Sequence, residues 1–434
     1  MRKLIIKNVG PITQTATIEF KRFCILIGPQ SNGKSTIAKI LSTCLWLEKE
    51  ACTSLNDNII NDGEEFVSQV EDFHRMHNYI HRDSSYIEYQ SPYITIIYDK
   101  GQFSMTFKDN LSYNRLKISY MPSDRNIVTM KDIEKRDLEP TNFRSFLFDW
   151  LDTNRNFDSQ HKTPILNLDV KYYFDDKAKD RMDKLTHVNG VTYDIPLYDA
   201  SSGMQSLVPM TVLMHYLTTG YFDNYGKDTS FDQQQKQNER AWAITREVTT
   251  KYYPEEVKQN NYKEVYNKLI KSKSVEHDHV ATACIEEMKD LFVRFTMPQS
   301  ISFILEEPEQ NLFPQTQVDL FNDIISLCNA KHPSSVFITT HSPYLLAAAN
   351  ILLFIGRLKS LGVSSQQMKD ITGTETFIGE GDFNAYTVSG GTCHSVIDEK
   401  THLIKENELD SASDYNAEVF DRLYQIYVQY LNNK

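Results

Sequence analysis

One short segment of the chain has the residue types and spacing of a loop that binds phosphate groups. Residues 28–35 read GPQSNGKS and fit the pattern G-x-x-x-x-G-K-[ST]. An apolar run at 23–27 precedes them and predicts a buried strand, while the segment from 36 onward predicts a helix. The pattern therefore stands in the strand–loop–helix context that a nucleoside triphosphate site requires.

The residue types in this loop suit that chemistry. Its glycines allow backbone N–H groups to curl around phosphates, and the helix N-terminus adds partial positive charge. Lys34 can reach the β- and γ-phosphates, and the Ser35 hydroxyl can ligate Mg²⁺. We therefore predict nucleotide contacts from Gly28, Asn32, Gly33, Lys34, Ser35 and Thr36.

Three later segments also carry groups suited to phosphate chemistry. An apolar run from 302 ends in the paired carboxylates Glu306 and Glu307, and a second run from 335 ends at His341. Strands of a parallel sheet deliver such residues to the edge where nucleotides bind. Ser202 and Gly203 open a predicted helix, which favours either a second anion-binding end or an ordinary helix cap. A lone histidine such as His341 is, in most proteins, structural.

Taken together, the four motifs resemble the ATP-binding-cassette (ABC) type of ATPase head, in particular the SMC-like branch that includes the overcoming-lysogenization-defect ATPases. The resemblance implies ATP and Mg²⁺ as cofactors, with Lys34 and Ser35 in the Walker A roles. Glu306 takes the Walker B position and would hold the metal with Ser35. Glu307 matches the catalytic base, and His341 matches the switch histidine.

The same resemblance implies that the chain works as a dimer. Ser202, Gly203 and Gln205 match the signature S-G-x-Q. In this class the signature helix of one subunit faces the γ-phosphate held by the other, so two heads sandwich ATP. Binding of ATP would then join the subunits, and hydrolysis would release them.

The chain departs from the family pattern at several positions. Glu306 stands where Asp is usual, Met204 replaces the second glycine of the transporter signature, and Asn311 stands where related chains often carry histidine. The glutamine that completes Mg²⁺ coordination is not assigned, and Gln90 is too weak a candidate. These departures are compatible with a slow, switch-like ATPase as well as with a fast one.

The predicted fold is α/β: an ABC-type P-loop NTPase head with a mixed sheet, N-terminal antiparallel strands and a helical insertion. Apolar alternation at 93–98 and 117–120 predicts strands where long-armed relatives have coiled coils. The expected organisation has four parts, namely an N-terminal head part (1–220), a helical insertion (221–297), a C-terminal head part (298–360) and a closing strand/helix region (361–434).

Composition places the protein among soluble intracellular machines. The chain has 434 residues with a net charge of −12, which argues against a protein coated with nucleic acid but not against a local basic groove. No apolar stretch reaches the length of a membrane helix, so no membrane partner is expected. The six cysteines have no paired spacing, which is typical of buried thiols in a reducing cytoplasm.

The insertion at 221–297 is the predicted docking surface for a partner. Lysines give it a locally basic face for DNA or RNA, although a solvated helix face explains them as well; they are Lys258, Lys263, Lys268, Lys271 and Lys273. A helical stripe at the C-terminus, formed by Val419, Leu423, Ile426, Tyr427 and Tyr430, predicts a packing or oligomer face.

Three further features carry weaker interpretations. Arg125 is expected either to contact a phosphate or a neighbouring subunit, or to be a surface arginine in a turn. His74, His77 and His81, like the segment 276–279, lack the context of a metal site, so no metal role is assigned. We find neither an HNH-like constellation nor a Toprim nuclease pattern.

Three functions fit these observations. The favoured one is an ATPase subunit that senses phage infection and controls a separate effector, such as a nuclease, resembling the ATPases of Septu-, PARIS- and retron-associated defence systems. The alternative is a RecF-like DNA repair ATPase acting directly on DNA. A third, the nucleotide-binding subunit of a membrane transporter, is disfavoured by the signature and the insertion.

Overall fold

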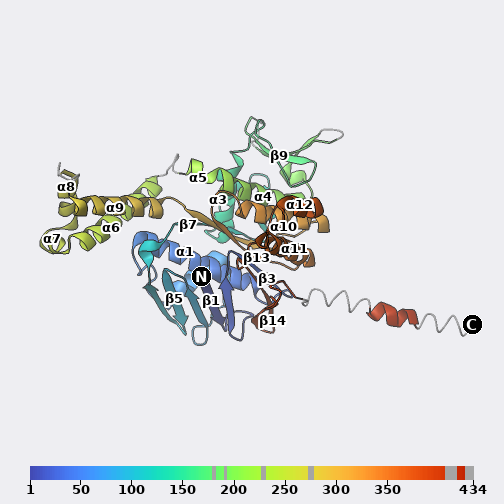
Figure 1. The fold of residues 1–434 in the computed structure, drawn as a ribbon, viewed down its shortest axis with the longest axis horizontal. Helices are drawn as coiled ribbons and strands as arrows, with labels where there is room; N and C mark the ends of the chain where they lie inside the picture. Colours follow the sequence, from blue (N-terminus) through green and yellow to red (C-terminus); the bar gives the residue numbers. More distant parts are fainter. Residues whose placement is uncertain (178–181, 190–192, 226–230, 272–277, 406–417, 426–434) are drawn as a thin grey trace, which may run out of the picture.

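The computed structural model describes residues 1–177, 182–189, 193–225, 231–271, 278–405 and 418–425. Three sheets organise this part of the chain (Figure 1). The central one has six strands in the order β15-β14-β3-β13-β12-β7. Its strands are β3 (Phe23–Ile27), β7 (Leu116–Met121), β12 (Ser300–Glu306), β13 (Ser334–Thr339), β14 (Phe383–Ser389) and β15 (Thr392–Ser395).

The central sheet is parallel except at one edge. Neighbouring strands from β7 to β14 run parallel, and only β15 pairs antiparallel with β14. All of β3 is buried, as is β12 after its first residue, which fits strands covered on both faces. The carboxyl ends of β3, β12 and β13 therefore meet at one edge, where a site can form.

A second sheet is antiparallel and comes mostly from the N-terminal part of the chain, in the order β2-β1-β4-β5-β6. Its strands are β1 (Arg2–Lys7), β2 (Ala16–Phe20), β4 (Tyr86–Gln90), β5 (Ile94–Asp99) and β6 (Gln102–Phe107). Helix α1 (Lys34–Ser54) packs between this sheet and the central one, so one hydrophobic cluster contains residues of both sheets. Helix α2 (Gly63–His74) joins the same cluster.

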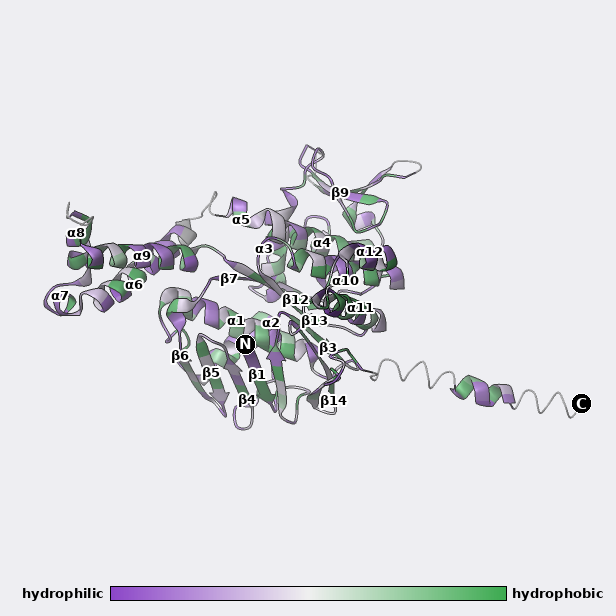
Figure 2. Ribbon diagram, viewed as in Figure 1, coloured by the Kyte–Doolittle hydropathy of each residue, from purple (hydrophilic) through white to green (hydrophobic). Residues whose placement is uncertain are grey.

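Helices cover the other face of the central sheet and share a second hydrophobic cluster with it. They are α3 (Asn142–Asn154), α4 (Ser202–Thr219), α10 (Pro314–Cys328), α11 (Pro343–Ser360) and α12 (Ser365–Thr372). Figure 2 shows apolar residues along α4 and α11, in keeping with their burial. A small antiparallel sheet lies beyond these helices and consists of β8 (Thr163–Pro164), β9 (Val170–Asp175), β10 (Met182–His187) and β11 (Asp194–Pro196).

The segment predicted as an insertion is helical, and all of it after its first short helix projects from the body (Figure 1, left). It contains α5 (Tyr221–Asn224), α6 (Phe231–Tyr252), α7 (Pro254–Gln259), α8 (Tyr262–Lys271) and α9 (His279–Thr296). Short 3-10 turns complete the described elements: η1 (Asn110–Ser112), η2 (Arg125–Thr129), η3 (Ile133–Lys135) and η4 (Leu197–Asp199). The predicted α/β class, with a mixed sheet, antiparallel N-terminal strands and a helical insertion, is confirmed, while the domain boundaries stay predictions.

Several smaller expectations have clear outcomes. The strands expected at 93–98 and 117–120 are β5 and β7. All six cysteines are buried free thiols. Among the helices described, none is both long and apolar enough to cross a membrane. Of the predicted C-terminal stripe, Val419 and Leu423 lie in a helical segment at 418–425, and Ile426, Tyr427 and Tyr430 lie outside the described residues.

Candidate nucleotide-binding site

The predicted phosphate loop connects β3 to α1 at the carboxyl edge of the central sheet. Gly28 has φ +137°, and a Cβ there would lie 2.3 Å from the carbonyl oxygen of Val388. Gly33 has φ +99°, and a Cβ there would lie 2.6 Å from Cδ1 of Ile12. Only glycine fits both positions, because the backbone is left-handed and the space is filled.

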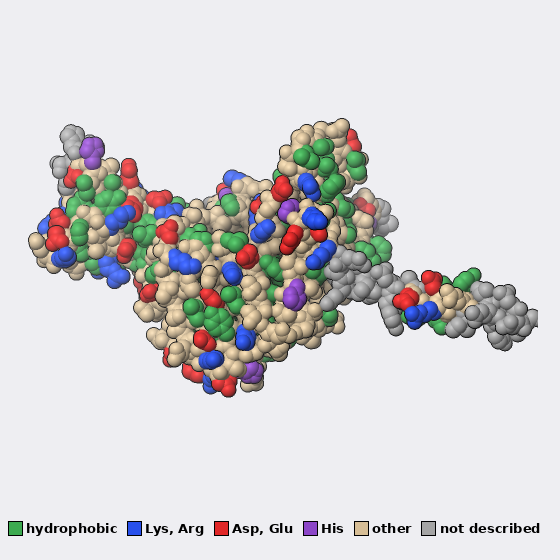
Figure 3. Space-filling model, turned by 60° about the horizontal axis from the view of Figure 1, so that its bottom comes forward, with side chains coloured by type: hydrophobic (Ala, Val, Ile, Leu, Met, Phe, Trp, Pro, Cys, Tyr) green, Lys and Arg blue, Asp and Glu red, His purple; other side chains and the backbone are tan. Residues whose placement is uncertain are grey.

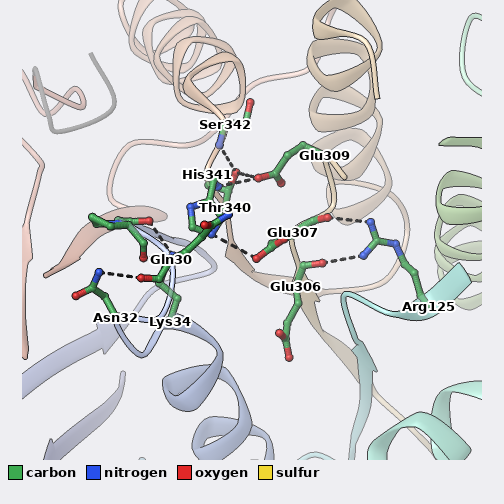
Figure 4. Close-up of polar contacts among 12 residues, drawn as sticks. Gln30, Asn32, Lys34, Arg125, Glu306, Glu307, Glu309, Thr340, His341 and Ser342 are labelled. Atoms are coloured by element: carbon green, nitrogen blue, oxygen red, sulfur yellow. Dashed lines mark hydrogen bonds and ion pairs between the residues drawn. The ribbon is translucent and has the colours of Figure 1, made fainter. Parts of the chain in front are cut away.

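Lys34 begins α1 and folds back over the loop (Figure 4). Its ammonium donates to the carbonyl oxygens of Gly28 at 2.7 Å and Pro29 at 2.9 Å. Burial lowers the pKa of Lys34, while the nearby carboxylates Glu307 and Glu309 raise it. The amine is thus held beside two carboxylates by weak carbonyl partners, which a phosphate can replace with stronger charge-assisted hydrogen bonds.

The other predicted residues lie in the same loop and in the first turn of α1. The Asn32 side-chain amide donates to the carbonyl oxygen of Gln30 at 3.2 Å and so closes the loop. Ser35 is half-buried and Thr36 is buried in the first turn of α1. The first turn of a helix offers unpaired N–H groups to an anion.

Glu306 ends β12 and is 4% exposed. It accepts a short hydrogen bond from the hydroxyl of Tyr120. Burial raises the pKa of the Glu306 carboxyl, and the Ser35 hydroxyl and the Lys39 ammonium oppose that shift. The predicted metal-binding pair, Ser35 and Glu306, is therefore brought together by β12 and α1.

Tyr120 is a site residue that sequence reasoning did not assign. Strand β7 pairs parallel with β12, and Tyr120 stands opposite Ile304 in that register. Its ring is buried and its hydroxyl reaches the strand-end carboxylate. The apolar run at 117–120 carried the signal for a strand, but only the strand order puts this tyrosine beside Glu306.

Glu307 leaves the strand in a left-handed conformation, with φ +42°. Its backbone N–H donates to the carbonyl oxygen of Thr339 at 2.9 Å, which ties the turn to β13. Its Oε1 atom lies 3.4 Å from Nε2 of His341 (Figure 4). The side chains of Glu307 and His341 are 34% and 25% exposed, so water can reach the predicted base and the predicted switch histidine.

Glu309 is a second residue whose role the sequence did not reveal. Its Oε1 atom accepts hydrogen bonds from the Thr340 hydroxyl and the His341 N–H, both at 2.7 Å. Burial raises the pKa of the Glu309 carboxyl, and Oε2 is buried without a partner. Glu309 therefore positions the end of β13, and with it His341. The sequence feature that could have identified Glu309 is its position three residues after Glu306.

The structure corrects both interpretations of Arg125. Its side chain is fully buried, so it is not a surface arginine, and its partners are backbone carbonyls. Nε donates to Ser206 at 3.0 Å, Nη1 to Glu306 at 2.8 Å and Nη2 to Glu307 at 2.8 Å. Longer bonds reach Pro122 and Pro308. Burial lowers the pKa of Arg125 to about 10. Arg125 thus braces the Glu306–Glu307 turn against helix α4.

The signature residues lie at the N-terminus of α4. Ser202 is exposed, and a Cβ on Gly203 would lie 2.7 Å from the carbonyl oxygen of Asn311. The side-chain amide of Gln205 donates to the carbonyl oxygens of Tyr198 at 2.8 Å and Ala200 at 3.0 Å. Within the described chain no recorded hydrogen bond joins these residues to the phosphate loop. The predicted contact of these residues with a nucleotide held by a second subunit stays a prediction.

The remaining candidates fall outside this site. Gln90 lies on β4 and donates to Glu88 at 2.5 Å. His74 is buried against Tyr120, with ring centroids 5.4 Å apart, and burial lowers its pKa to about 3. No group of three metal-ligating side chains occurs among the described residues. Residues 276 and 277 of the predicted 276–279 cluster lie outside them.

The expected basic face of the insertion is divided among several contacts. Lys258 pairs with Glu255 at 2.8 Å, and the Lys263 ammonium lies 4.7 Å from the centre of the Trp242 ring. Lys273 lies outside the described residues. Figure 3 shows acidic and basic side chains intermixed over the insertion, at the left of that view.

No protein-family model and no curated protein matches the sequence. Among solved structures, the chain is similar to the SMC head domain from Thermotoga maritima (10% identity, 91% of this chain and 97% of that chain, TM-score 0.35). It is also similar to an Smc head domain with an extended coiled coil from Pyrococcus furiosus, bound to the C-terminal domain of ScpA (9% identity, 96% and 100%, TM-score 0.36). The recombination mediator RecF gives 8% identity, 91% and 97%, and a TM-score of 0.30. At scores this low the likeness carries no functional conclusion, so function rests on the geometry of the site.

Proposed function

We propose that this chain binds and hydrolyses ATP with Mg²⁺, as an SMC-like, ABC-type ATPase head. The observation that carries the proposal is the meeting of three strand ends and one helix start. Lys34 and Ser35 begin α1 after β3. Glu306 ends β12, Glu307 follows it, and His341 follows β13.

The residues present suit the two bound groups. The glycine loop and the first turn of α1 offer backbone donors to phosphate oxygens, and Lys34 adds a cation. Ser35 and Glu306 would hold Mg²⁺, since a hydroxyl and a carboxylate are the oxygen ligands this ion prefers. The bound ion would supply neutralisation of the phosphate charge. Burial raises the pKa of the Glu306 carboxyl, and a cation bound beside it would oppose that shift and favour the ionised form.

Hydrolysis then needs a base beside the γ-phosphate, and Glu307 is placed for it. Its carboxylate would take a proton from water as the water oxygen attacks the γ-phosphorus and the bond to the β-phosphate oxygen breaks. His341, held through its N–H by Glu309, faces the same carboxylate and would orient it or donate to the γ-phosphate. The products are ADP and phosphate.

The exposed signature supports a second part of the proposal, an ATP-sandwiched dimer. Ser202 is exposed at the start of α4, and Gly203 packs against the backbone of Asn311 after the acidic turn. Arg125 joins this helix to the turn by bonding to Ser206 and Glu307. A change at Glu307 during turnover would therefore reach the subunit interface through one buried guanidinium.

We further propose that this dimer acts in the cytoplasm as a switch in anti-phage defence, which senses infection and controls a separate effector such as a nuclease. The motif resemblance supports this role, and the projecting helices α6–α9 offer a surface on which such a partner can dock. The buried, unpaired cysteines fit a reducing compartment.

The dimer is tested with Glu307→Gln, which keeps the size of the side chain and removes the base. We expect light scattering to show the mass of two chains with MgATP and of one chain without it. Glu380→Gln, at an exposed position, is the matched control. A Glu307→Gln protein whose mass does not respond to ATP contradicts the sandwich.

The defence role is tested by recovering tagged Glu307→Gln from its native host with the neighbouring genes intact. Stoichiometric recovery of a nuclease or another toxic protein, released when the wild type hydrolyses ATP, supports effector control. Recovery of DNA without a protein partner contradicts it and favours a repair role.

A further inference from the structure

A second cleft lies beside the phosphate site, along the flank of α1. It has a volume of about 890 Å³ and is lined by α1, β7, α3 and the segment from the end of α4 through α5. None of residues 28–36 lines it, so it is separate from the phosphate loop. Small-molecule sites in proteins commonly have volumes of roughly 300–1,000 Å³.

The lining of this cleft is positively charged in an acidic protein. Four cationic side chains line it (Lys49, Arg115, Lys117 and Arg155) against two acidic ones (Asp149 and Asp152), in a chain of net charge −12. Lys117 is neutralised by Asp149, with N–O distances of 2.7 and 2.8 Å. Lys49 is paired with Glu50, which does not line the cleft, so Arg115 and Arg155 against Asp152 leave the lining with a small excess of positive charge, which attracts an anion.

Two of these cations are held in fixed positions. The Lys49 ammonium lies 3.2 Å from Glu50. Burial, together with the charges of Arg115 and Lys117, lowers the pKa of Lys49 to about 8, and Glu50 opposes that shift. Arg115 donates to the carbonyl oxygen of Thr296 at 2.9 Å and to the Tyr225 hydroxyl. Its Nε is buried without a partner, and no ion pair is recorded for it in the described structure.

Aromatic rings form another part of the lining. Trp46, Phe73, Tyr216, Tyr221 and Tyr225 all border the cleft. The ring centre of Tyr221 lies 5.5 Å from that of Tyr225 and 6.4 Å from that of Tyr216. These three rings, which we call the tyrosine wall, meet edge to face, with interplanar angles of 67° and 75°. The Lys117 ammonium lies 5.9 Å from the Tyr221 centre, so a ring face and a cation stand side by side. Aromatic side chains stack on nucleobases, while lysine and arginine bind phosphates.

We propose that this cleft binds a small nucleotide, with its base against the tyrosine wall and its phosphate near Lys49 and Arg115. The combination of planar rings and excess cations in one cavity fits a base joined to a phosphate better than either part alone. The cavity can hold a mononucleotide or a dinucleotide, and the end of a single strand presents the same chemistry.

The cleft also touches the phosphate site through one residue. Tyr120 lines it, and the Tyr120 hydroxyl bonds to Glu306. Behind this ring, His74 packs at 5.4 Å. A nucleotide in the cleft would thus press on the residue that holds the strand-end carboxylate, and so would change ATP turnover. This coupling rests on the proposed ATPase function, whereas the binding itself does not.

Binding is measured by calorimetry on the full chain carrying Lys34→Ala, so that the phosphate loop does not dominate. The probes are the four ribonucleoside monophosphates, the dinucleotide pApA, adenosine and inorganic phosphate. We expect at least one nucleotide to bind with one site per chain and about tenfold or more tighter than adenosine or phosphate, because only the nucleotide satisfies rings and cations together. A chain that binds none of the nucleotides overturns the proposal.

Variants locate that binding. Lys49→Gln and Tyr221→Leu should each weaken it about tenfold, and Lys289→Gln, an exposed lysine on α9, should leave it unchanged. Arg155→Gln, at the exposed edge of the cleft, should also weaken binding, and this substitution does not disturb the interior of the protein. Equal affinity in all four variants overturns the assignment to this cleft.

A 5′-phosphorylated oligonucleotide distinguishes the two possible ligands, a free nucleotide and the end of a single strand. Binding of pApA as tight as that of the oligonucleotide identifies a free nucleotide. Tighter binding of the oligonucleotide that is lost in Lys49→Gln identifies a strand end, and binding of the oligonucleotide alone overturns the proposal.

In the wild type, the nucleotide that binds should change ATP turnover by about twofold or more, and Lys49→Gln should remove the effect. Binding without this change rejects the coupling alone, and absence of any turnover rejects the ATPase.

Discussion

Two acidic regions of this molecule are built in different ways. In the candidate site, Glu306 is buried and Glu309 is half-buried, and the Oε2 atom of Glu309 is buried without a partner. In the small sheet, Asp183 on β10 accepts hydrogen bonds from the Tyr172 hydroxyl at 2.5 Å and the Asn154 amide at 3.3 Å. Burial raises the pKa of Asp183 to about 6. Asp183 joins α3 to β9 and β10, so its hydrogen bonds serve packing.

The backbone shows the same contrast. Around the site, Glu307 has φ +42°, Ser31 +61° and Asn311 +62°, although none of them is glycine. Such conformations cost roughly 1 kcal/mol or more each and persist where the surrounding structure holds them. Asp183 sits in a regular strand. The acidic turn of the candidate site thus combines left-handed residues with an unpartnered carboxylate oxygen, whereas the carboxylate of Asp183 stands in a regular strand and accepts two hydrogen bonds.

The largest effect is expected in the candidate site. Lys34→Ala should weaken ATP binding about 100-fold or more, because each charge-assisted hydrogen bond to phosphate contributes about 1.5–3 kcal/mol. The thermal midpoint should change little, since Lys34 donates only to loop carbonyls. Calorimetric titration with ATP measures the first quantity and thermal unfolding the second. Retained affinity would remove Lys34 from the site.

The brace between the acidic turn and α4 should give the next effect. Arg125→Lys leaves at least two of the carbonyls now bonded by the guanidinium without a donor, since an ammonium has three N–H groups and a different geometry. We expect a loss of about 2–5 kcal/mol in the free energy of unfolding, measured by denaturant titration. Arg136→Lys, at an exposed arginine, is the control. Equal stability of the two variants would contradict the bracing role.

A smaller effect should appear at Asp183 and should depend on pH. The pKa of Asp183 is about 6 in the folded chain, against 3.8 for an ordinary aspartate. The folded state therefore binds more protons between these values, and its stability falls as the pH rises through that window. Asp183→Asn should remove this loss, and the neighbouring Oδ1 of Asn154, which lacks a partner, is available to the new amide.

We expect Asp183→Asn to be about 1–3 kcal/mol more stable than the wild type at pH 8 and to have no such advantage at pH 4. Denaturant titrations at both pH values measure the difference. A gain of the same size at both values would show that the effect is not ionisation. In that case the stability of the region around Asp183 would not depend on the charge of its carboxylate.

Much of the site was predictable because its motifs are local. The loop at 28–35, the acidic pair and His341 each follow a recognisable apolar run, and a parallel sheet brings such ends together. Tyr120 and Arg125 were not assigned correctly, since their partners are about 180 residues away in sequence. Their roles depend on β7 pairing with β12, which no local pattern specifies.

The small sheet β8–β11 was not predicted at all. Its strands are two to six residues long, and β9 and β10 are only partly buried. Hydrophobic alternation is too short there to distinguish a strand from a loop. The helical insertion, by contrast, has long amphipathic segments, and its helices agree with the prediction.

The most direct test of the proposed chemistry is steady-state phosphate release from MgATP by the wild type and by Glu307→Gln, with ATP affinity measured in parallel. We predict release by the wild type that depends on Mg²⁺, and a rate about 10²–10⁴-fold lower for Glu307→Gln at similar ATP affinity, since that is the usual contribution of a positioned base. Equal rates in the two proteins, or no release by the wild type, would contradict an ATPase that works through this carboxylate.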